Sequence, residues 1–298
     1  MLKLLPQPAS ETTQLGGPGR PWSIHYGADR AILRWNDASR WRAFGFSDDE
    51  AIASIEWLHA FLRDLAYTGF VAPRPMDDLG ERSIAIAEGG IWELLSRVPG
   101  RAMGWSDDEI FEAGALLARF HAAAMSLPNR PQRPGAQPFA SCEPAHPDAQ
   151  AIRTAFVHEL ADLDLRSTTR GVIHGDATQS NVVRTASGTF HLVDYAIAYA
   201  DYLLADIGSA LWRNARRSPD AISYDAARAA RFVGGYDSVR PLGRGASRAI
   251  VSFMKGRGLQ LLHRLELLHG RDETVIQRLT VINAAQDELA VAIEAALS

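Results

Sequence analysis

Cysteine is nearly absent from this 298-residue chain, which has only Cys142 and therefore cannot form a disulfide within itself. A single cysteine fits a reducing compartment. Long apolar runs are also missing: a run of about 18 apolar residues, the minimum for a membrane span, occurs nowhere. Pro6 and Pro8 interrupt the N-terminal apolar stretch that a signal peptide would need. We expect a cytoplasmic protein without a membrane partner.

An excess of positive charge is missing as well. The formal net charge is −4 and the pI is near 6.1, which disfavours binding to a phosphate backbone, so no nucleic-acid partner is expected. Hydrophobic residues make up 47% of the chain and charged residues 22%, the balance of an ordinary globular protein. The length suffices for one large domain or two lobes. The sequence does not indicate an oligomeric state.

The most informative stretch of the chain runs from Val172 to Asp194. An apolar strand end precedes His174-Gly175-Asp176, Asn181 follows after four residues, and twelve residues separate Asn181 from Asp194. A hairpin turning at Ser187-Gly188 is predicted between Asn181 and Asp194. Asp and Asn in loops are usually turn formers. In this order, however, they match phosphoryl-transfer sites, where an Asp orients a hydroxyl and an Asn and a second Asp hold metal ions.

This pattern, with HGD in place of the protein-kinase HRD, resembles the aminoglycoside phosphotransferase and choline kinase superfamily. The resemblance implies a two-lobed, protein-kinase-like α+β fold. A small antiparallel five-stranded sheet with one helix is expected in residues 1–96, and a mainly helical catalytic and substrate lobe in residues 97–298. It also implies that Asp176 is the catalytic base or hydroxyl-orienting group, that His174 braces the loop, and that Asn181 and Asp194 bind Mg²⁺.

The resemblance further implies that the first lobe binds ATP or GTP. Arg34 follows the apolar Ala31-Ile32-Leu33, where these kinases place a basic phosphate-binding residue, usually Lys. A guanidinium keeps that charge and can bind phosphate, although Arg30 is a nearby competitor. Glu56, in the following helix, would pair with this cation. The backbone from Ser96 to Val98 would meet the adenine edge.

Glycines near the N-terminus are a further candidate phosphate site. Residues 15–35 are predicted to form two strands, and the first strand is preceded by Gly16, Gly17 and Gly19. Glycines let backbone N–H groups approach phosphates closely. A flexible turn is an equally good interpretation, since G-x-G-x-x-G is absent.

Helical patterns fill most of the remaining chain. Capping boxes at Ser47–Glu50 and Ser106–Glu109 predict helices that end near Tyr67 and Met125. Later helices are predicted over residues 149–165, 224–235, 246–269 and 272–296. His121 is interpreted as a core histidine and Asp206 as a structural brace of the catalytic loop. Three basic residues are interpreted as a solvated helix face: Lys255, Arg257 and Arg264.

The predicted function is ATP- or GTP-dependent phosphorylation of a small-molecule hydroxyl, with Mg²⁺. The resemblance points first to an aminoglycoside-like antibiotic as acceptor, and so to antibiotic resistance, with homoserine, choline or a sugar as alternatives. A polycationic acceptor needs carboxylates, and the candidates are Asp201, Asp272, Glu273, Asp287 and Glu288. A pseudokinase scaffold is the rival interpretation. It is favoured by Arg34 in place of Lys and opposed by the intact Asp176, Asn181 and Asp194.

Overall fold

The computed structural model describes residues 9–14, 21–26, 29–77, 83–163, 165, 168–270 and 272–297. These residues divide into two compact units. Unit 1 contains the described residues up to Pro99 together with Arg133–Gly135, and unit 2 contains Gly100–Gln132 and the described residues from Ala136 onward. Gly16, Gly17 and Gly19 lie outside the described residues, so their proposed phosphate contact stays a prediction.

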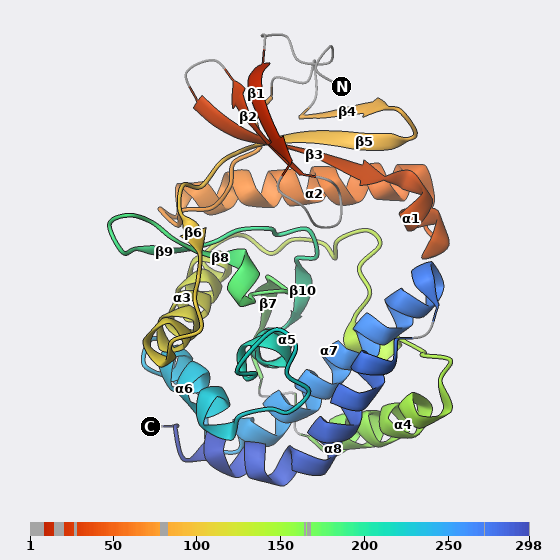
Figure 1. Ribbon diagram of the computed structural model, residues 1–298, viewed down its shortest axis with the longest axis vertical. Coiled ribbons are helices and arrows are strands. Elements are labelled where there is room, and N and C mark those ends of the chain that lie inside the picture. The colour runs from red at the N-terminus through yellow and green to blue at the C-terminus, as the bar shows by residue number, and fades with distance from the viewer. Residues whose placement is uncertain are drawn as a thin grey trace. The chain divides into compact units, whose positions relative to one another are not determined.

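Unit 1 is built on a five-stranded antiparallel sheet, as expected (Figure 1). In spatial order its strands are β1 (Ala9–Gln14), β2 (Trp22–Tyr26), β3 (Asp29–Asp37), β5 (Gly90–Ser96) and β4 (Ile84–Ala87). The edge strand β1 was not predicted, because its sequence ASETTQ lacks apolar alternation.

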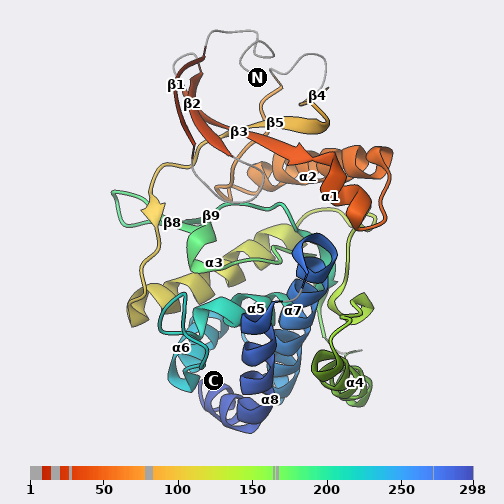
Figure 2. The same cartoon turned by 45° about the vertical axis from the view of Figure 1, so that its right-hand side comes forward.

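One helix covers a face of this sheet in both views (Figures 1 and 2). This helix, α2 (Asp48–Tyr67), begins at Ser47 with the predicted capping box: Ser47 Oγ accepts from the Glu50 N–H, and Glu50 accepts from the Ser47 N–H. Ile55 of α2 belongs to the same buried cluster as Ile84 and Ile91 of the sheet. The apolar spacing of α2 therefore forms the sheet–helix core of unit 1. A short helix, α1 (Ala38–Ala43), precedes α2 and was not predicted.

Unit 2 is mainly helical, as expected. Its longer helices are α3 (Asp107–Met125), α4 (Pro147–Asp162), α5 (Leu203–Asn214), α6 (Ala226–Asp237), α7 (Ala246–His269) and α8 (Glu273–Glu294). Its short strands form one pair, β7 (Arg170–Ile173) with β10 (Tyr199–Tyr202), and one three-stranded sheet of β6 (Arg101–Ala102), β8 (Val182–Arg184) and β9 (Phe190–Leu192). Among the described residues, no helix is both long and apolar enough to cross a membrane.

The central position of α7 overturns one prediction. Lys255 and Arg257 are not on a solvated helix face: Lys255 is fully buried and Arg257 is 8% exposed. Figures 1 and 2 show α8 running beside α7 in both views. Lys255 Nζ pairs with Glu159 of α4 and lies 2.9 Å from Gln286 Oε1 of α8. The prediction failed because α7 is covered on several sides, so its polar residues face partners within the protein.

Helices α3 and α6 approach each other through glycines. A Cβ at Gly114 of α3 would lie 1.9 Å from the Phe232 carbonyl oxygen, and a Cβ at Gly235 of α6 would lie 2.0 Å from the Phe111 carbonyl oxygen. Neither position has room for a side chain, because the opposing atoms are backbone and cannot turn away.

We predict that Gly235→Ala destabilises the protein by about 1–3 kcal/mol or more, since overpacking forces a backbone shift. The neighbouring Gly234→Ala is the matched control, because its nearest contact would be 3.8 Å away. It is expected to be neutral or to stabilise by up to about 1 kcal/mol through helix propensity. Urea unfolding of both variants measures the difference, and equal midpoints would contradict the close α3–α6 approach.

Candidate active site

Helix α5 holds the backbone of the loop between β7 and β8. Asp206 is fully buried: its Oδ2 accepts from the His174 N–H at 2.7 Å and its Oδ1 from the Gly175 N–H at 2.8 Å. His121 of α3 donates from Nε2 to Asp206 Oδ2 at 2.9 Å. The pKa of Asp206 is lowered, because these hydrogen bonds and the nearby histidines outweigh the effect of burial. Asp206 is thus the predicted brace, and His121 is the predicted buried core histidine.

Two further side chains of α5 hold the same loop. Ser209 Oγ donates to the Gly175 carbonyl oxygen at 2.5 Å. Asn214 accepts from the Gln179 N–H at 3.1 Å and donates to the Ala177 carbonyl oxygen at 3.0 Å. Sequence reasoning missed Ser209 and Asn214. Their positions on one helix with Asp206 were the only available signal.

Gly175 is required at the centre of this loop. Its φ is +79°, and a Cβ there would lie 2.9 Å from the Ile197 carbonyl oxygen. The middle residue of HGD therefore combines a left-handed backbone with a close contact that only glycine fits.

His174 joins Asp176 to the strand end that carries Asp194. Its Nδ1 accepts from the Asp176 N–H at 3.2 Å, and its Nε2 lies 3.1 Å from the Val193 carbonyl oxygen. The carbonyl can only accept, so Nε2 carries the proton and the ring is neutral. Tyr195 packs on the ring with centroids 4.5 Å apart. The tertiary contacts thus support the bracing predicted for His174.

The pH dependence of stability follows from this tautomer. Burial lowers the pKa of His174 below its usual value near 6.5, so the unfolded chain takes up a proton more readily than the folded one. The stability that the neutral His174 contributes is therefore fully present above about pH 6.5. It falls as the pH drops below that value, by up to about 1.4 kcal/mol per pH unit.

We predict a shallower stability loss between pH 7.5 and 5.5 for His174→Asn than for the wild type, measured by urea unfolding. The exposed His158 of α4 supplies the control His158→Asn, whose slope should match the wild type. An unchanged slope in His174→Asn would show that another group causes the pH dependence.

Asp176 presents its two carboxylate oxygens to different partners. Oδ2 accepts from Asn181 Nδ2 at 2.9 Å, and Asn181 Nδ2 also lies 2.9 Å from the Asp176 carbonyl oxygen. Oδ1 accepts from Arg257 Nη2 at 3.1 Å. Because both bonds of Asn181 use its amide nitrogen, its Oδ1 is the atom that could bind a cation. Arg257 was not predicted at the site.

Asp194 adopts an unusual backbone conformation. Its φ is +61°, in the left-handed region that a non-glycine residue seldom occupies, and its side chain is exposed. Asp194 Oδ1 accepts from the Ala196 N–H at 3.3 Å. Asp is among the residues that enter this region most readily, and Glu88 in the turn between β4 and β5 also has a positive φ of +55°, so the conformation by itself does not identify a site. Carboxylate and amide oxygens are ligands that Mg²⁺ accepts, so Asn181 and Asp194 fit the metal-binding role proposed for them.

In unit 1, Arg34 pairs with a carboxylate that the sequence analysis did not consider. Arg34 Nε donates to Oε1 of Glu93 on β5 at 2.7 Å, and Asn36 Nδ2 donates to the same oxygen at 2.6 Å. His59 of α2 donates from Nε2 to Glu93 Oε2 at 2.9 Å. Glu93 is fully buried, and the charge of Arg34 with these hydrogen bonds lowers its pKa despite that burial. Glu56 is exposed on α2, and its role stays a prediction.

We predict that Glu93→Gln destabilises the protein by about 3–5 kcal/mol, because it leaves the Arg34 charge without its buried partner. Guanidinium chloride unfolding measures the loss. Glu288→Gln, at an exposed position of α8, is the control and should change stability by less than about 0.5 kcal/mol. Similar midpoints for both variants would contradict the importance of the Arg34–Glu93 pair.

The predicted adenine-binding backbone is partly occupied. The Ser96 N–H donates to the Arg74 carbonyl oxygen at 2.8 Å, and the Arg97 N–H donates to the Arg30 carbonyl oxygen at 3.0 Å. Among residues 96–98, Val98 is therefore the candidate whose N–H could donate to adenine. Ser96 could contact adenine only by accepting through its carbonyl oxygen. The adenine contact of Ser96 and Val98 stays a prediction.

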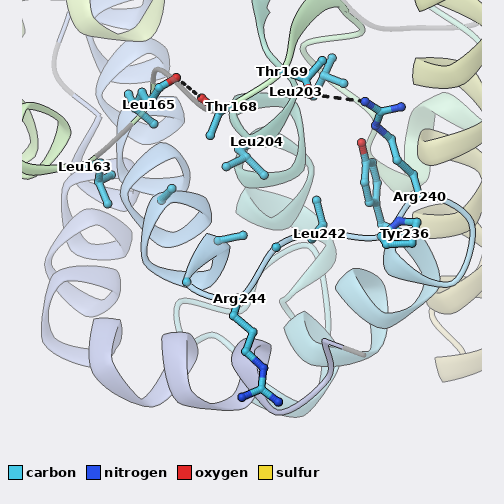
Figure 3. Close-up of a pocket in the computed structure, with 15 residues that line it drawn as sticks. Leu163, Leu165, Thr168, Thr169, Leu203, Leu204, Tyr236, Arg240, Leu242 and Arg244 are labelled. Atoms are coloured by element: carbon cyan, nitrogen blue, oxygen red, sulfur yellow. Dashed lines mark hydrogen bonds between the residues drawn. The ribbon is translucent and has the colours of Figure 1, made fainter.

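A cavity of about 380 Å³ lies elsewhere in unit 2. Figure 3 shows Arg240 beside Tyr236 in its wall, with the Arg240–Thr169 hydrogen bond dashed. The Tyr236 hydroxyl lies 2.8 Å from His121 Nδ1, so the wall connects through His121 to Asp206. The lining contains none of the predicted site residues, and the cavity is therefore distinct from the candidate active site.

Comparison with known proteins shows that the chain is an enzyme of the small-molecule kinase type, with a protein-kinase-like fold. The family model described as "Phosphotransferase enzyme family" matches residues 23–242. The chain belongs to that family.

Curated relatives share less than a third of their residues with this chain. It is similar to the homoserine kinase of Phenylobacterium zucineum (strain HLK1), with 29% identity over 219 residues, 70% of this chain and 67% of the relative. The homoserine kinase of Methylobacillus glycogenes is 26% identical over 237 residues, 72% of each chain.

Two solved structures illustrate the fold. An amicoumacin kinase bound to AMP-PNP, Ca²⁺ and Ami matches with a TM-score of 0.67 and 16% identity, covering 93% of this chain and 88% of that one. A microcompartment-associated aminopropanol kinase matches with a TM-score of 0.65 and 17% identity, covering 95% and 91%. At these identities the likeness concerns the fold alone.

Proposed function

We propose that the protein transfers the γ-phosphoryl group of ATP or GTP to a hydroxyl group of a small metabolite. The observation that supports this proposal most strongly is the fixed position of the Asp176 carboxylate. It lies beside the amide of Asn181, and His174 joins its backbone to the strand end that carries Asp194. An inert scaffold has no need for this arrangement, so we favour an active kinase over a pseudokinase.

Asp176 would act on the acceptor hydroxyl. The hydroxyl oxygen forms a bond to the γ-phosphorus while the bond from that phosphorus to the bridging β-phosphate oxygen breaks. The nucleoside diphosphate leaves, and the hydroxyl proton passes to Asp176 and then to solvent. Because the transition state is loose, Asp176 contributes mainly by orienting the hydroxyl.

Asn181 and Asp194 would hold Mg²⁺, with Arg34 binding the nucleotide phosphates from unit 1. When bound, the metal neutralises charge that develops on the phosphate oxygens. A cytoplasmic location suits an enzyme that uses this nucleotide pool and has only one, buried cysteine.

The acceptor is better described as a metabolite than as an aminoglycoside. The curated relatives above are named homoserine kinases. The cation Arg257 contacts Asp176, whereas Asp272, one of the carboxylates suggested for a polycation, caps helix α8. An aminoglycoside-like acceptor is kept as the second candidate because aminoglycoside phosphotransferases are among the solved structures with this fold.

We predict that Asp176→Asn lowers kcat by about 10²–10⁴-fold, since the amide cannot take the hydroxyl proton. The measurement is ADP or GDP release with Mg²⁺ across homoserine, choline, amino alcohols, sugars and aminoglycosides. Asp162→Asn, at an exposed position of α4, should retain full activity. An active Asp176→Asn enzyme would contradict the role of Asp176.

The metal role of Asp194 has a separate readout in nucleotide binding. Mg²⁺ should increase the thermal stabilisation by ATP in the wild type but not in Asp194→Ala. If Mg²⁺ and ATP stabilise both proteins equally, the assignment of Asp194 is wrong even where turnover is observed.

A further inference from the structure

Arg257 contacts the carboxylate oxygen of Asp176 that Asn181 does not hold. Asn181, the proposed metal ligand, donates to Asp176 Oδ2, which leaves Oδ1 as the oxygen that an acceptor hydroxyl could reach. Arg257 Nη2 lies 3.1 Å from this Oδ1. An acceptor hydroxyl that reaches Oδ1 therefore arrives beside a guanidinium group.

The hydrogen-bonding capacity of Arg257 is only partly used. Its Nη1 donates to Gln260 Oε1 at 2.5 Å and its Nη2 to Asp176. Its Nε is buried and has no hydrogen-bond partner among the described residues. The whole side chain is only 9% exposed. A buried N–H without an acceptor is costly, and an arginine fork is suited to a carboxylate. The Nε is thus a donor to which a bound carboxylate would supply the acceptor.

Packing fixes the backbone on both sides of Arg257. A Cβ at Gly256 would lie 2.7 Å from the Phe156 ring, and a Cβ at Gly258 would lie 2.5 Å from the Trp212 ring. Gln260 donates from Nε2 to the Gln137 carbonyl oxygen at 2.7 Å, which anchors the side chain that holds Arg257. The guanidinium is therefore preorganised, and little rotamer entropy would be lost when a ligand binds.

Other guanidinium groups accompany Arg257 in this part of unit 2. Burial raises the pKa of the Cys142 thiol to about 11, while the charges of Arg264, Arg257 and Arg153 act in the opposite direction. The carboxylates of Asp176 and Asp201 act on the same region, so the positive charge that an incoming carboxylate would meet is chiefly that of Arg257 itself.

We propose that Arg257 binds the carboxylate of the acceptor, and that the acceptor is a small hydroxy acid. This inference rests on the proposed function, since it places the acceptor hydroxyl at Asp176. The incoming carboxylate takes Nε and a neighbouring N–H of Arg257, which loosens the contact with Asp176 and leaves Oδ1 to receive the hydroxyl. Because Arg257 and Asp176 are adjacent, the hydroxyl and the carboxylate are separated by only a few carbon atoms.

The decisive comparison uses three acceptors that share a hydroxyl group at the end of a three-carbon chain and differ in what that chain carries. L-Homoserine carries a hydroxyl, an amino group and a carboxylate; 3-amino-1-propanol lacks the carboxylate, and 4-hydroxybutanoate lacks the amino group. We measure kcat/KM for each with Mg·ATP, using the full chain. The wild type should prefer homoserine to 3-amino-1-propanol by about 10- to 100-fold, the range expected for a charged hydrogen-bonding pair.

In Arg257→Gln this preference should fall to a few-fold, mostly through a higher KM for homoserine, and activity on 4-hydroxybutanoate should fall in parallel with homoserine. Arg257→Lys, which keeps the charge but loses the fork, should show an intermediate preference and covers the case in which Arg257→Gln does not fold. Arg248→Gln, exposed on the same helix, should leave the preference unchanged.

Two outcomes would overturn the inference while leaving the proposed function intact. The first is wild-type turnover that is equal or faster on 3-amino-1-propanol or on an aminoglycoside. The second is an equal fall in kcat/KM for all acceptors in Arg257→Gln, which would mean that Arg257 only orients Asp176. Failure of the proposed function looks different: the wild type would bind nucleotide but release no ADP with any acceptor.

Discussion

The buried carboxylate of Asp206 accepts hydrogen bonds from the backbone at His174 and Gly175 and from the side chain of His121. A carboxylate with no solvent exposure is tolerated only where such donors replace water. This requirement fixes the positions of α5, α3 and the loop after β7 relative to one another. Helix α5 carries Asp206, and α3 and the loop supply its hydrogen-bond donors. The position of Asp176, one residue beyond Gly175, depends on that arrangement.

Two other buried charges follow the same rule. Glu93 has Arg34, Asn36 and His59 as donors, and Lys255 has Glu159 and Gln286 as acceptors. Arg257 and Arg228 depart from the rule, since each has a buried N–H without a partner among the described residues. Real proteins accept such departures at functional sites, and Arg257 is the one of the two that contacts the proposed catalytic carboxylate.

Backbone constraints set the spacing of the candidate groups. Gly175 and Asp194 both have positive φ values, and the His174 ring connects Asp176 to Val193, one residue before Asp194. The His174 ring thus fixes the backbone beside Asp176 and Asp194, while the side chains of Asn181 and Arg257 hold the Asp176 carboxylate. Such preorganisation is the main way a protein assists phosphoryl transfer, because the reaction asks for positioning and charge stabilisation.

Features that depend on neighbouring residues could be predicted from the sequence. They include the HGD motif with its following Asn and Asp, the capping box at Ser47 and the bounds of α7. The pairing of distant charges could not be predicted: Arg34 pairs with Glu93, 59 residues away, and Arg257 with Asp176, 81 residues away. Periodicity shows which side chains share a face, whereas packing decides whether that face meets water or another element. For α7 it meets other elements, and a helix whose charges resembled a solvated surface instead contributes Arg257 to the candidate active site.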